Sequence, residues 1–167
     1  TAFAILRAEE LSAQAHDPGM RLAGFVMGPN DIARETRIRM VPGRTTMLPA
    51  YMHCILAARA HGLDILDGPY GDIANAQGFA EECAQSRDMG FDGKTLIHPS
   101  QIDPCNAAFT PPADEVARAR RIVDAFAQPE NARRGAIQLD GRMVERLHAE
   151  MAERTLAIAD AIAAAQA

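Results

Sequence analysis

Residues 90–102 read GFDGKTLIHPSQI, and this stretch decides the expected fold. After a glycine turn and Lys94, residues 95–98 form a short apolar run that predicts a buried strand. The chain must leave that strand in an extended conformation, because Pro99 disfavours a helical backbone at His98. Polar residues directly after a parallel strand are typical of the edge at which α/β proteins build their sites. We therefore expect a parallel strand here, with a candidate site at its carboxyl end.

The same pattern continues toward the start of the chain. Residues 21–27 and 63–66 are short apolar runs bounded by turn residues, and they predict two further strands. Residues 32–44 are rich in arginine and predict a loop or a short irregular helix. Alternating strands and helices predict an α/β fold with a parallel sheet, but alternation does not distinguish a barrel from an open doubly wound sheet. Helical patterns cover residues 2–14, 48–61, 76–89 and 104–109.

The pattern of the sequence changes at Thr110, and two prolines follow this residue. Thr110 and Pro111 fit the N-cap and the first residue of a helix. Residues 142–165 predict a second, longer helix. We therefore predict two domains: an α/β body over residues 1–109, and an appendage of two helices without a partner strand over residues 110–167.

Large apolar residues mark the face that each helix is expected to bury. In residues 2–14 these are Phe3, Leu6 and Leu11. In the two tail helices they are Val116, Ala119, Val123 and Phe126, and then Met143, Leu147, Met151, Ile158 and Ile162.

Composition and charge limit the classes of function. A chain of 167 residues that is 48% hydrophobic can bury a core, and its net charge of −5 argues against a large nucleic-acid surface, although it excludes no small anionic ligand. The sequence has no apolar run of about 18 residues and no signal-peptide pattern, so we expect no membrane span and a cytoplasmic location. Three cysteines fit no zinc spacing and predict free thiols. They are Cys54, Cys83 and Cys105.

The sequence Gly-Pro-Asn-Asp at residues 28–31 places an aspartate at the carboxyl end of the first predicted strand. Asp31 can bind a hard cation such as Mg²⁺ through a carboxylate oxygen. It can also cap the helix that follows, and spacing alone favours the capping role.

Other charged residues near the predicted strand ends each allow two interpretations. Asp67 and Asp72 can shape the mouth of a site or cap the next helix, and capping is favoured. Lys94 can pair with a phosphate or a carboxylate, or mark the solvated start of its strand, and a lone histidine such as His98 is more often structural than catalytic. Four arginines close together can hold phosphates, but they are more often a solvated face. They are Arg34, Arg37, Arg39 and Arg44.

Asp140 lies in Leu-Asp-Gly-Arg-Met, between an extended piece expected at residues 136–139 and the long tail helix. Its position favours a helix N-cap. The functional alternative is a general acid or base carried by a mobile lid.

Taken together, these residues resemble the HpcH/HpaI aldolase group of acyl-CoA lyases, the family of citrate lyase β-subunits and malyl-CoA lyases. The resemblance runs over essentially the whole chain. Gly-Pro-Asn-Asp takes the place of the family's G-x-x-D strand end, in which Pro29 and Asn30 are variants. The most specific stretches are GFDGKTLIHPSQI, the following NAAFTPPADEVARARRIVDAF, and IQLDGRMVE.

The resemblance implies a TIM (β/α)8 barrel. Residues 1–109 would supply about the last three βα units, preceded by a helix, and residues 110–167 a C-terminal helical lid. Mg²⁺, or Mn²⁺ in its place, would be bound by Asp31 and by a glutamate in an Ile-Glu-Thr type motif. That motif would end at Thr1, so the glutamate is expected immediately upstream of this sequence. The substrate-binding arginine is expected earlier still, in the N-terminal half of the barrel.

The implied reaction is reversible C–C cleavage of a 3-hydroxyacyl-CoA of the malyl-, citramalyl- or citryl-CoA type. Its products are acetyl-CoA, or another acyl-CoA, and a 2-oxo acid, and Asp140 would exchange a proton with the acetyl-CoA methyl carbon. The lid would reach the site of a neighbouring subunit in a homo-oligomer, either a homotrimer or a hexamer. Substrate binding is implied for Gly28, Asn30 and Asp31, and binding of the coenzyme A thioester for Lys94, Ile97, His98 and Pro99.

Three other functions stay open. A malyl-CoA thioesterase would use the same site with water as the second reactant. A relative without activity would serve as a non-catalytic subunit or scaffold of a larger complex. A purely structural segment is the remaining alternative, because half of the implied metal site lies outside this sequence. The presence of Asp31 and Asp140 favours an enzyme.

Overall fold

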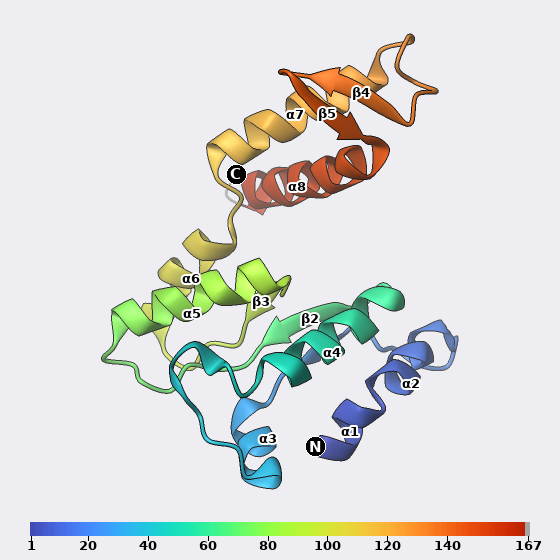
Figure 1. Cartoon of the computed structure of the whole chain (residues 1–167). Helices are drawn as coiled ribbons and strands as arrows, with labels where there is room; N and C mark the ends of the chain where they lie inside the picture. Colours follow the sequence, from blue (N-terminus) through green and yellow to red (C-terminus); the bar gives the residue numbers. More distant parts are fainter. Residues whose placement is uncertain (166–167) are drawn as a thin grey trace. The chain divides into compact units, whose positions relative to one another are not determined.

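The computed structural model of the protein describes residues 1–165. The chain forms two compact units, divided between Phe109 and Thr110, and each unit has its own hydrophobic core (Figure 1). Within residues 1–165, no helix has both the length and the apolar character needed to cross a membrane.

The first unit is built on a parallel three-stranded sheet in the order β1-β2-β3, which confirms the α/β fold predicted for it. Strand β2 lies in the centre, and its last residue, Asp67, is paired with Lys94 of β3. At the other end of the sheet, a Cβ on Gly24 would lie 2.6 Å from the Asp64 carbonyl oxygen, so only glycine allows this close pairing. The strands are β1 (Gly24–Val26), β2 (Asp64–Asp67) and β3 (Gly93–Lys94).

Two helices connect the strands and confirm the predicted crossovers. Helix α4 (Leu48–Ala60) joins β1 to β2, and α5 (Ala76–Met89) joins β2 to β3. The bounds of α5 follow from its caps: the Asn75 side chain accepts a hydrogen bond from the Gly78 amide, and Gly90 ends the helix with a φ of 98°.

Among the shorter elements of this unit, one prediction is partly confirmed and another is wrong. The short helix that is one of the two alternatives for residues 32–44 is present, but it starts earlier, at Pro29, as proline favours at a first helical position, and it ends at Thr36. Strand β3 ends at Lys94 instead of spanning residues 95–98, because β2 ends at Asp67 and leaves those residues no strand to pair with. The remaining elements are α1 (Ala2–Leu6), α2 (Ala8–Ala13), η1 (Gln14–His16), α3 (Pro29–Thr36), η2 (Pro42–Arg44), η3 (Pro99–Gln101) and α6 (Ile102–Phe109).

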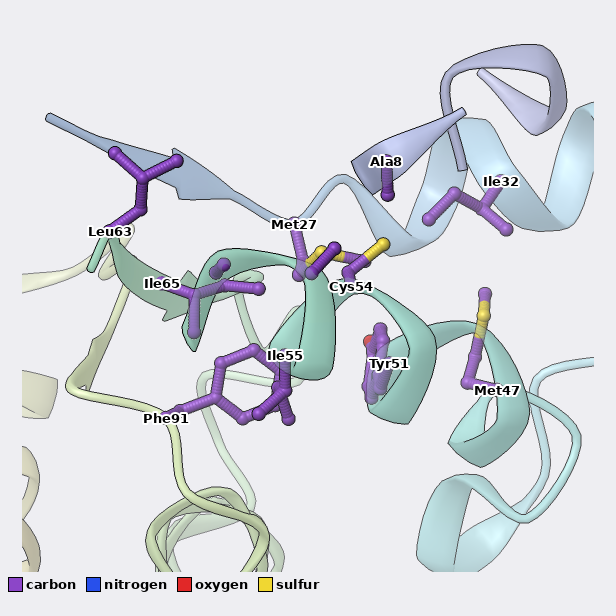
Figure 2. Close-up of a cluster of buried hydrophobic side chains, with 12 residues drawn as sticks. Ala8, Met27, Ile32, Met47, Tyr51, Cys54, Ile55, Leu63, Ile65 and Phe91 are labelled. Carbon is purple, nitrogen blue, oxygen red and sulfur yellow. The ribbon is translucent and has the colours of Figure 1, made fainter. Parts of the chain in front are cut away.

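The core of the first unit lies between α4 and the sheet. Figure 2 shows Ile55, Ile65 and Phe91 gathered there, and the Tyr51 ring meets the Phe91 ring edge-on at 5.5 Å. The anchors predicted for the first helix are wrong: Phe3, Leu6 and Leu11 are exposed, whereas Ala8 and Ser12 are buried. Small side chains lie inside because α2 packs closely against α4.

The second unit contains a β-hairpin, of which only the extended piece at residues 136–139 is expected from the sequence. Strand β4 (Ala136–Leu139) pairs antiparallel with β5 (Arg142–Glu145), so the tail does have a partner strand, and the long helix α8 begins only at Arg146. Asp140 and Gly141 form the two-residue turn, with φ values of 50° and 75°. An Asp-Gly pair between two strands is the usual signal for such a turn. The helices of the unit are α7 (Ala113–Ala127) and α8 (Arg146–Ala165).

Helices α7 and α8 pack face to face and enclose the second core. The face predicted for α7 is largely confirmed, since Ala119 and Phe126 are buried, although the helix starts at Ala113 after an N-cap at Pro112. The face predicted for the long helix is wrong. Its buried residues are Ala149, Ala152 and Leu156, because small side chains let α8 approach α7 closely, while Met143, Leu147, Met151 and Ile158 are exposed.

Candidate functional site

The carboxyl ends of the three parallel strands bring the candidate residues of the first unit to one edge of the sheet. Backbone hydrogen bonds hold the three exits side by side: the Met27 amide donates to the Leu66 carbonyl, and the Thr95 amide donates to the Asp67 carbonyl, each at 2.9 Å. The segments that follow β1, β2 and β3 therefore share one edge.

Asp31 is the third residue of α3 and is exposed there. The capping role favoured by spacing is wrong, because Gly28 is the N-cap of this helix and no side chain caps it. The Asp31 carboxylate lies 3.3 Å from the Arg34 guanidinium, and 76% of the aspartate side chain is exposed. An acidic group in the first turn is stabilised by the helix dipole, and the exposure of this carboxylate lets a ligand reach it.

Asp31 also lines a cavity of about 260 Å³ at the carboxyl end of β1, and Thr1 lines the same cavity. The start of α1 is held nearby, because the Ala2 amide donates a hydrogen bond of 2.8 Å to the Glu35 carboxylate of α3. The first residues of the chain therefore lie beside the candidate metal ligand.

The residues at this edge fit Mg²⁺ in a limited way. Mg²⁺ takes oxygen ligands, keeps several waters, and is often held by only one or two carboxylates. Asp31 offers one exposed carboxylate. Among residues 1–165 no group of three or more His, Cys, Asp or Glu side chains is arranged to hold a metal. Asp31 is therefore a candidate for one ligand of such a site.

Gly28 and Asn30 flank the buried Pro29 and are both exposed. The amides of Asn30 and Asp31 lie in the first turn of α3, after the carboxyl end of β1. In the first turn, a helix has no intrahelical acceptors for its N–H groups. These amides suit a carboxylate or another anionic oxygen group.

Lys94 does not lie at the surface. Its side chain is fully buried, and its ammonium group donates to the Asp67 carboxylate at 2.8 Å, the Glu82 carboxylate at 2.6 Å and the Gly68 carbonyl at 2.6 Å. Arg44 approaches the same carboxylates, at 2.6 Å from Asp67 and 3.5 Å from Glu82. We call Arg44, Asp67, Glu82 and Lys94 the buried charge cluster.

Two sequence interpretations are corrected by this cluster. Arg44 is 5% exposed and is not part of a solvated arginine face, although the other three arginines are exposed. Asp67 does not cap α5, since Asn75 does so. Neither contact is apparent from the sequence, because Arg44 and Lys94 lie 23 and 27 residues from Asp67. The one available signal was that Asp67 and Lys94 are the last residues of neighbouring strands.

The charges in the cluster stabilise one another. Burial alone would raise the pKa of Asp67, but the ammonium of Lys94, the Ser86 hydroxyl and the guanidinium of Arg44 outweigh it and hold that pKa below its usual value. Burial would lower the pKa of Arg44, but the Asp67 and Glu82 carboxylates raise it above its usual value. The Asp67 carboxylate and the Arg44 guanidinium are therefore both charged at neutral pH.

Ile97, His98 and Pro99 form an exposed surface after β3. The His98 side chain caps η3, because its Nδ1 accepts a hydrogen bond of 3.2 Å from the Ser100 amide. Ile97 is 51% exposed although it is apolar. Of the four residues expected to bind coenzyme A, Ile97, His98 and Pro99 are therefore exposed, whereas Lys94 is buried.

In the second unit, Asp140 lies at the tip of the hairpin turn and not at a helix N-cap. Its backbone is left-handed, with a φ of 50°, and 64% of its side chain is exposed. Its partner is Arg121 of α7, whose Nε lies 3.4 Å from the Asp140 carboxylate. The turn therefore presents a carboxylate that solvent and small molecules can reach.

Comparison with known proteins places this geometry in context. Residues 1–99 match the HpcH/HpaI aldolase/citrate lyase family. The chain is 47% identical over all 167 residues to the (3S)-malyl-CoA thioesterase of Cereibacter sphaeroides, of which it covers 57%. It is 38% identical over 125 residues to the citrate lyase subunit beta of Escherichia coli, covering 75% of this chain and 41% of that protein.

A solved structure shows the same arrangement of elements. The chain superposes on the protein CitE from Mycobacterium tuberculosis with a TM-score of 0.77 and 30% identity, over 96% of this chain and 58% of CitE. That structure was determined in complex with magnesium, acetoacetate and coenzyme A. The chain thus spans little more than half the length of these relatives.

Proposed function

The chain belongs to the HpcH/HpaI aldolase/citrate lyase family, and we propose that it is part of a magnesium-dependent enzyme acting on 3-hydroxyacyl-CoA thioesters of the malyl-CoA type. The observation that carries this proposal is the 47% identity to a (3S)-malyl-CoA thioesterase over all 167 residues, which includes both units. The likeness to a structure that holds magnesium and coenzyme A supports it.

The proposed architecture is a TIM barrel completed by residues outside this sequence. The parallel order β1-β2-β3 with crossover helices is the arrangement of consecutive units in such a barrel. In this proposal, the first unit supplies about three of the eight βα units, and the site lies at the carboxyl ends of their strands.

Each candidate residue has a defined part in binding. Asp31 would hold Mg²⁺ through its exposed carboxylate, and the ion would polarise a substrate oxygen when bound. The amides of Asn30 and Asp31 would bind the substrate carboxylate, next to Gly28, whereas Pro29 has no N–H to donate. The exposed surface of Ile97, His98 and Pro99 would line the path of coenzyme A. We leave Lys94 out of this surface because its side chain is fully buried.

Asp140 would move the proton that either reaction requires. In hydrolysis, water attacks the thioester carbonyl, the C–S bond breaks, and the Asp140 carboxylate takes the proton of the water. In C–C cleavage, the 3-hydroxyl group loses its proton to water and becomes the carbonyl of the 2-oxo acid as the bond between C2 and C3 breaks. Asp140, in its protonated form, would then give its proton to the enolate carbon, which becomes the methyl group of acetyl-CoA. Both roles need a carboxylate at the surface, as Asp140 has.

Thioester hydrolysis is the favoured reaction of the two. The sequence motifs favour C–C cleavage, but the match to the thioesterase extends over 100% of the chain at 47% identity, and the match to citrate lyase subunit beta covers 75% at 38%. Cleavage remains the second candidate, since the citrate lyase relatives belong to the same family.

The products of malyl-CoA distinguish the two reactions. The full-length protein, incubated with malyl-CoA and Mg²⁺, is expected to release malate and free coenzyme A. Acetyl-CoA and glyoxylate in equal amounts would show the lyase reaction instead. Formation of neither pair would overturn the proposed activity and favour a non-catalytic subunit.

The metal site is tested by Asp31→Ala. Removing the carboxylate is expected to raise the Kd for Mg²⁺ by about 10-fold or more, measured by calorimetry without substrate. Asp72→Ala is the matched control, because Asp72 is another exposed aspartate after a strand of the same sheet. Equal Mg²⁺ affinity of the Asp31→Ala variant and the natural protein would rule out Asp31 as a ligand.

We also propose that the second unit is a lid that serves the site of a neighbouring subunit in a homotrimer or a hexamer. Exposed apolar side chains on this unit, among them Met143, Leu147 and Met151, are consistent with a surface that contacts another chain. Mixing Asp31→Ala subunits with Asp140→Asn subunits tests the arrangement. Restored activity in the mixture is expected, and a mixture as inactive as its parts would contradict a shared site.

A further inference from the structure

The buried charge cluster holds the backbone of Gly68 from two sides. The Lys94 ammonium donates to the Gly68 carbonyl at 2.6 Å, and the Gly68 amide donates to the Asp67 carboxylate at 2.7 Å. Both partners belong to the cluster, so the position of Gly68 depends on the position of those charges.

Gly68 in turn lies directly against the start of α3. A Cβ on Gly68 would lie 2.1 Å from Cδ of Pro29 and 2.8 Å from the carbonyl oxygen of Met27. Real side-chain atoms do not approach so closely, so glycine is required here and the two backbones are in contact. Gly71, in the same loop, has no atom within 4 Å of its Cβ position.

Pro29 connects this contact to Asp31. It is the first residue of α3, it is buried, and Asp31 follows two residues later in the same helical turn. Helix α3 has only eight residues, and the other residue that it buries is Ile32. The direction of the first turn therefore depends on how Pro29 rests on Gly68.

We propose that the buried charge cluster is a positioning device for Asp31, which acts through the contact of Gly68 with Pro29. The proposal rests on the proposed role of Asp31 as a Mg²⁺ ligand. It assigns Lys94 and Asp67 a part in metal binding, although neither side chain touches the metal.

The chemistry of the cluster supports a positioning role over a purely stabilising one. Taking charges out of water is costly, and well-packed apolar side chains in place of a buried ion network often leave stability unchanged or raise it. Hydrogen bonds between charged groups, however, fix distances and directions more strictly than apolar contacts do. Two cations and two carboxylates balance each other here, so the cluster fixes the backbone without leaving an unpaired charge.

The contact is tested by Gly68→Ala, with Gly71→Ala as its control in the same loop. In the full-length protein, Gly68→Ala is expected to raise the Kd for Mg²⁺ by about 10-fold, as loss of an outer support of a metal ligand typically does. Gly71→Ala is expected to leave that Kd unchanged. Calorimetry without substrate measures the affinity, and circular dichroism checks that each variant is folded.

A second substitution separates positioning from a general loss of structure. Pro29→Ala removes the ring atoms that the new Cβ of Gly68→Ala would meet, so the double variant should bind Mg²⁺ more tightly than Gly68→Ala alone. The rescue is expected to be partial, because the Met27 carbonyl oxygen remains 2.8 Å from the Cβ position. Additive losses in the double variant would overturn the proposed contact.

The cluster itself is tested by Glu82→Gln against Glu81→Gln. Glu82 pairs with Lys94 at 2.6 Å, whereas its neighbour Glu81 is exposed and outside the cluster. Only Glu82→Gln is expected to weaken Mg²⁺ binding, by about 2- to 30-fold if the coupling is of the usual size. If Asp31→Ala weakens binding but Gly68→Ala and Glu82→Gln do not, the positioning role is wrong and the metal site stands. If Asp31→Ala has no effect, the proposed function itself fails.

Discussion

The two units differ in where their charged side chains lie. The first unit buries Arg44, Asp67 and Lys94 beneath the carboxyl edge of its sheet. The second unit has a core of alanine, isoleucine, valine, leucine and phenylalanine, and its candidate aspartate lies on a surface turn. In each unit, nevertheless, the candidate aspartate is exposed: Asp31 in the first and Asp140 in the second.

The two carboxylates differ in the contacts that hold their backbone in place. Asp31 belongs to a helix whose first residue rests on Gly68, and buried charges hold Gly68 from both sides. Asp140 belongs to a two-residue turn, supported by the pairing of Leu139 with Arg142. A ligand to a metal requires a fixed position, whereas a proton-transfer group needs an accessible one. Substitutions behind Asp31 in the first unit should therefore change stability and metal binding, whereas substitution of Asp140 in the second unit should change turnover.

The largest effect is expected from Asp140→Asn. The substitution removes the proton-transfer group and should lower turnover by about 100- to 10,000-fold, while acyl-CoA still binds. Asparagine tolerates the left-handed backbone at this position, so the hairpin should remain intact. Steady-state kinetics and a separate acyl-CoA binding measurement check this. Unchanged turnover would remove Asp140 from the mechanism.

Two controls on the same unit sharpen that result. Arg121→Ala removes the exposed partner of Asp140, and exposed ion pairs contribute at most about 1 kcal/mol, so stability should change little. Asp124→Asn changes an exposed aspartate of α7, in the same unit as Asp140, and should leave turnover unaffected. A loss of activity in the Asp124→Asn variant as large as in Asp140→Asn would point to a general effect on the unit.

The next effect is on stability, from Asp67→Asn. This change leaves two buried cations short of a carboxylate, and breaking a buried ion pair typically costs about 3–5 kcal/mol in the free energy of unfolding. Urea denaturation at pH 7 measures the loss. Asp72→Asn serves as the control, because Asp72 is exposed in the same loop. A loss no larger than that of the control would show that the cluster contributes no stability.

The pH dependence of that loss of stability follows from the direction in which folding shifts the pKa of Asp67. Because the pKa of Asp67 is lower in the folded protein than its usual value, its contribution is present above the unfolded value of about 3.9. It is lost as the pH falls through the folded pKa. The natural protein and the Asp67→Asn variant should therefore differ at neutral pH and converge in acid. A constant difference down to the lowest pH would contradict an ionised Asp67.

The smallest effect is expected from Gly141→Ala in the hairpin turn. Gly141 has a φ of 75°, and a side chain in the left-handed region costs about 1–2 kcal/mol. Gly135→Ala is the control, since Gly135 has an ordinary φ and open space at its Cβ position. Thermal unfolding measures both variants. Equal melting temperatures would show that the turn does not depend on glycine.

Part of the fold could be predicted because the information is local. The bounds of α5 follow from Asn75 and Gly90, which cap the helix whatever surrounds it. The β4–β5 hairpin was equally local, since Asp140 and Gly141 carry the turn signal, but the long helical pattern after them hid it. That error therefore came from the choice between two local signals.

By itself, the sequence determined the α/β class, the family and the two exposed candidate aspartates, because short motifs and the alternation of elements carry them. Only the tertiary structure decided which side chains are inside. Leu6 is exposed while Ser12 is buried, since close packing of helices selects small residues. Lys94, which the sequence places at a ligand surface, is buried against Asp67. A charge pair between residues far apart in the chain produces no periodic pattern in the sequence. It depends on the register in which two strands pair.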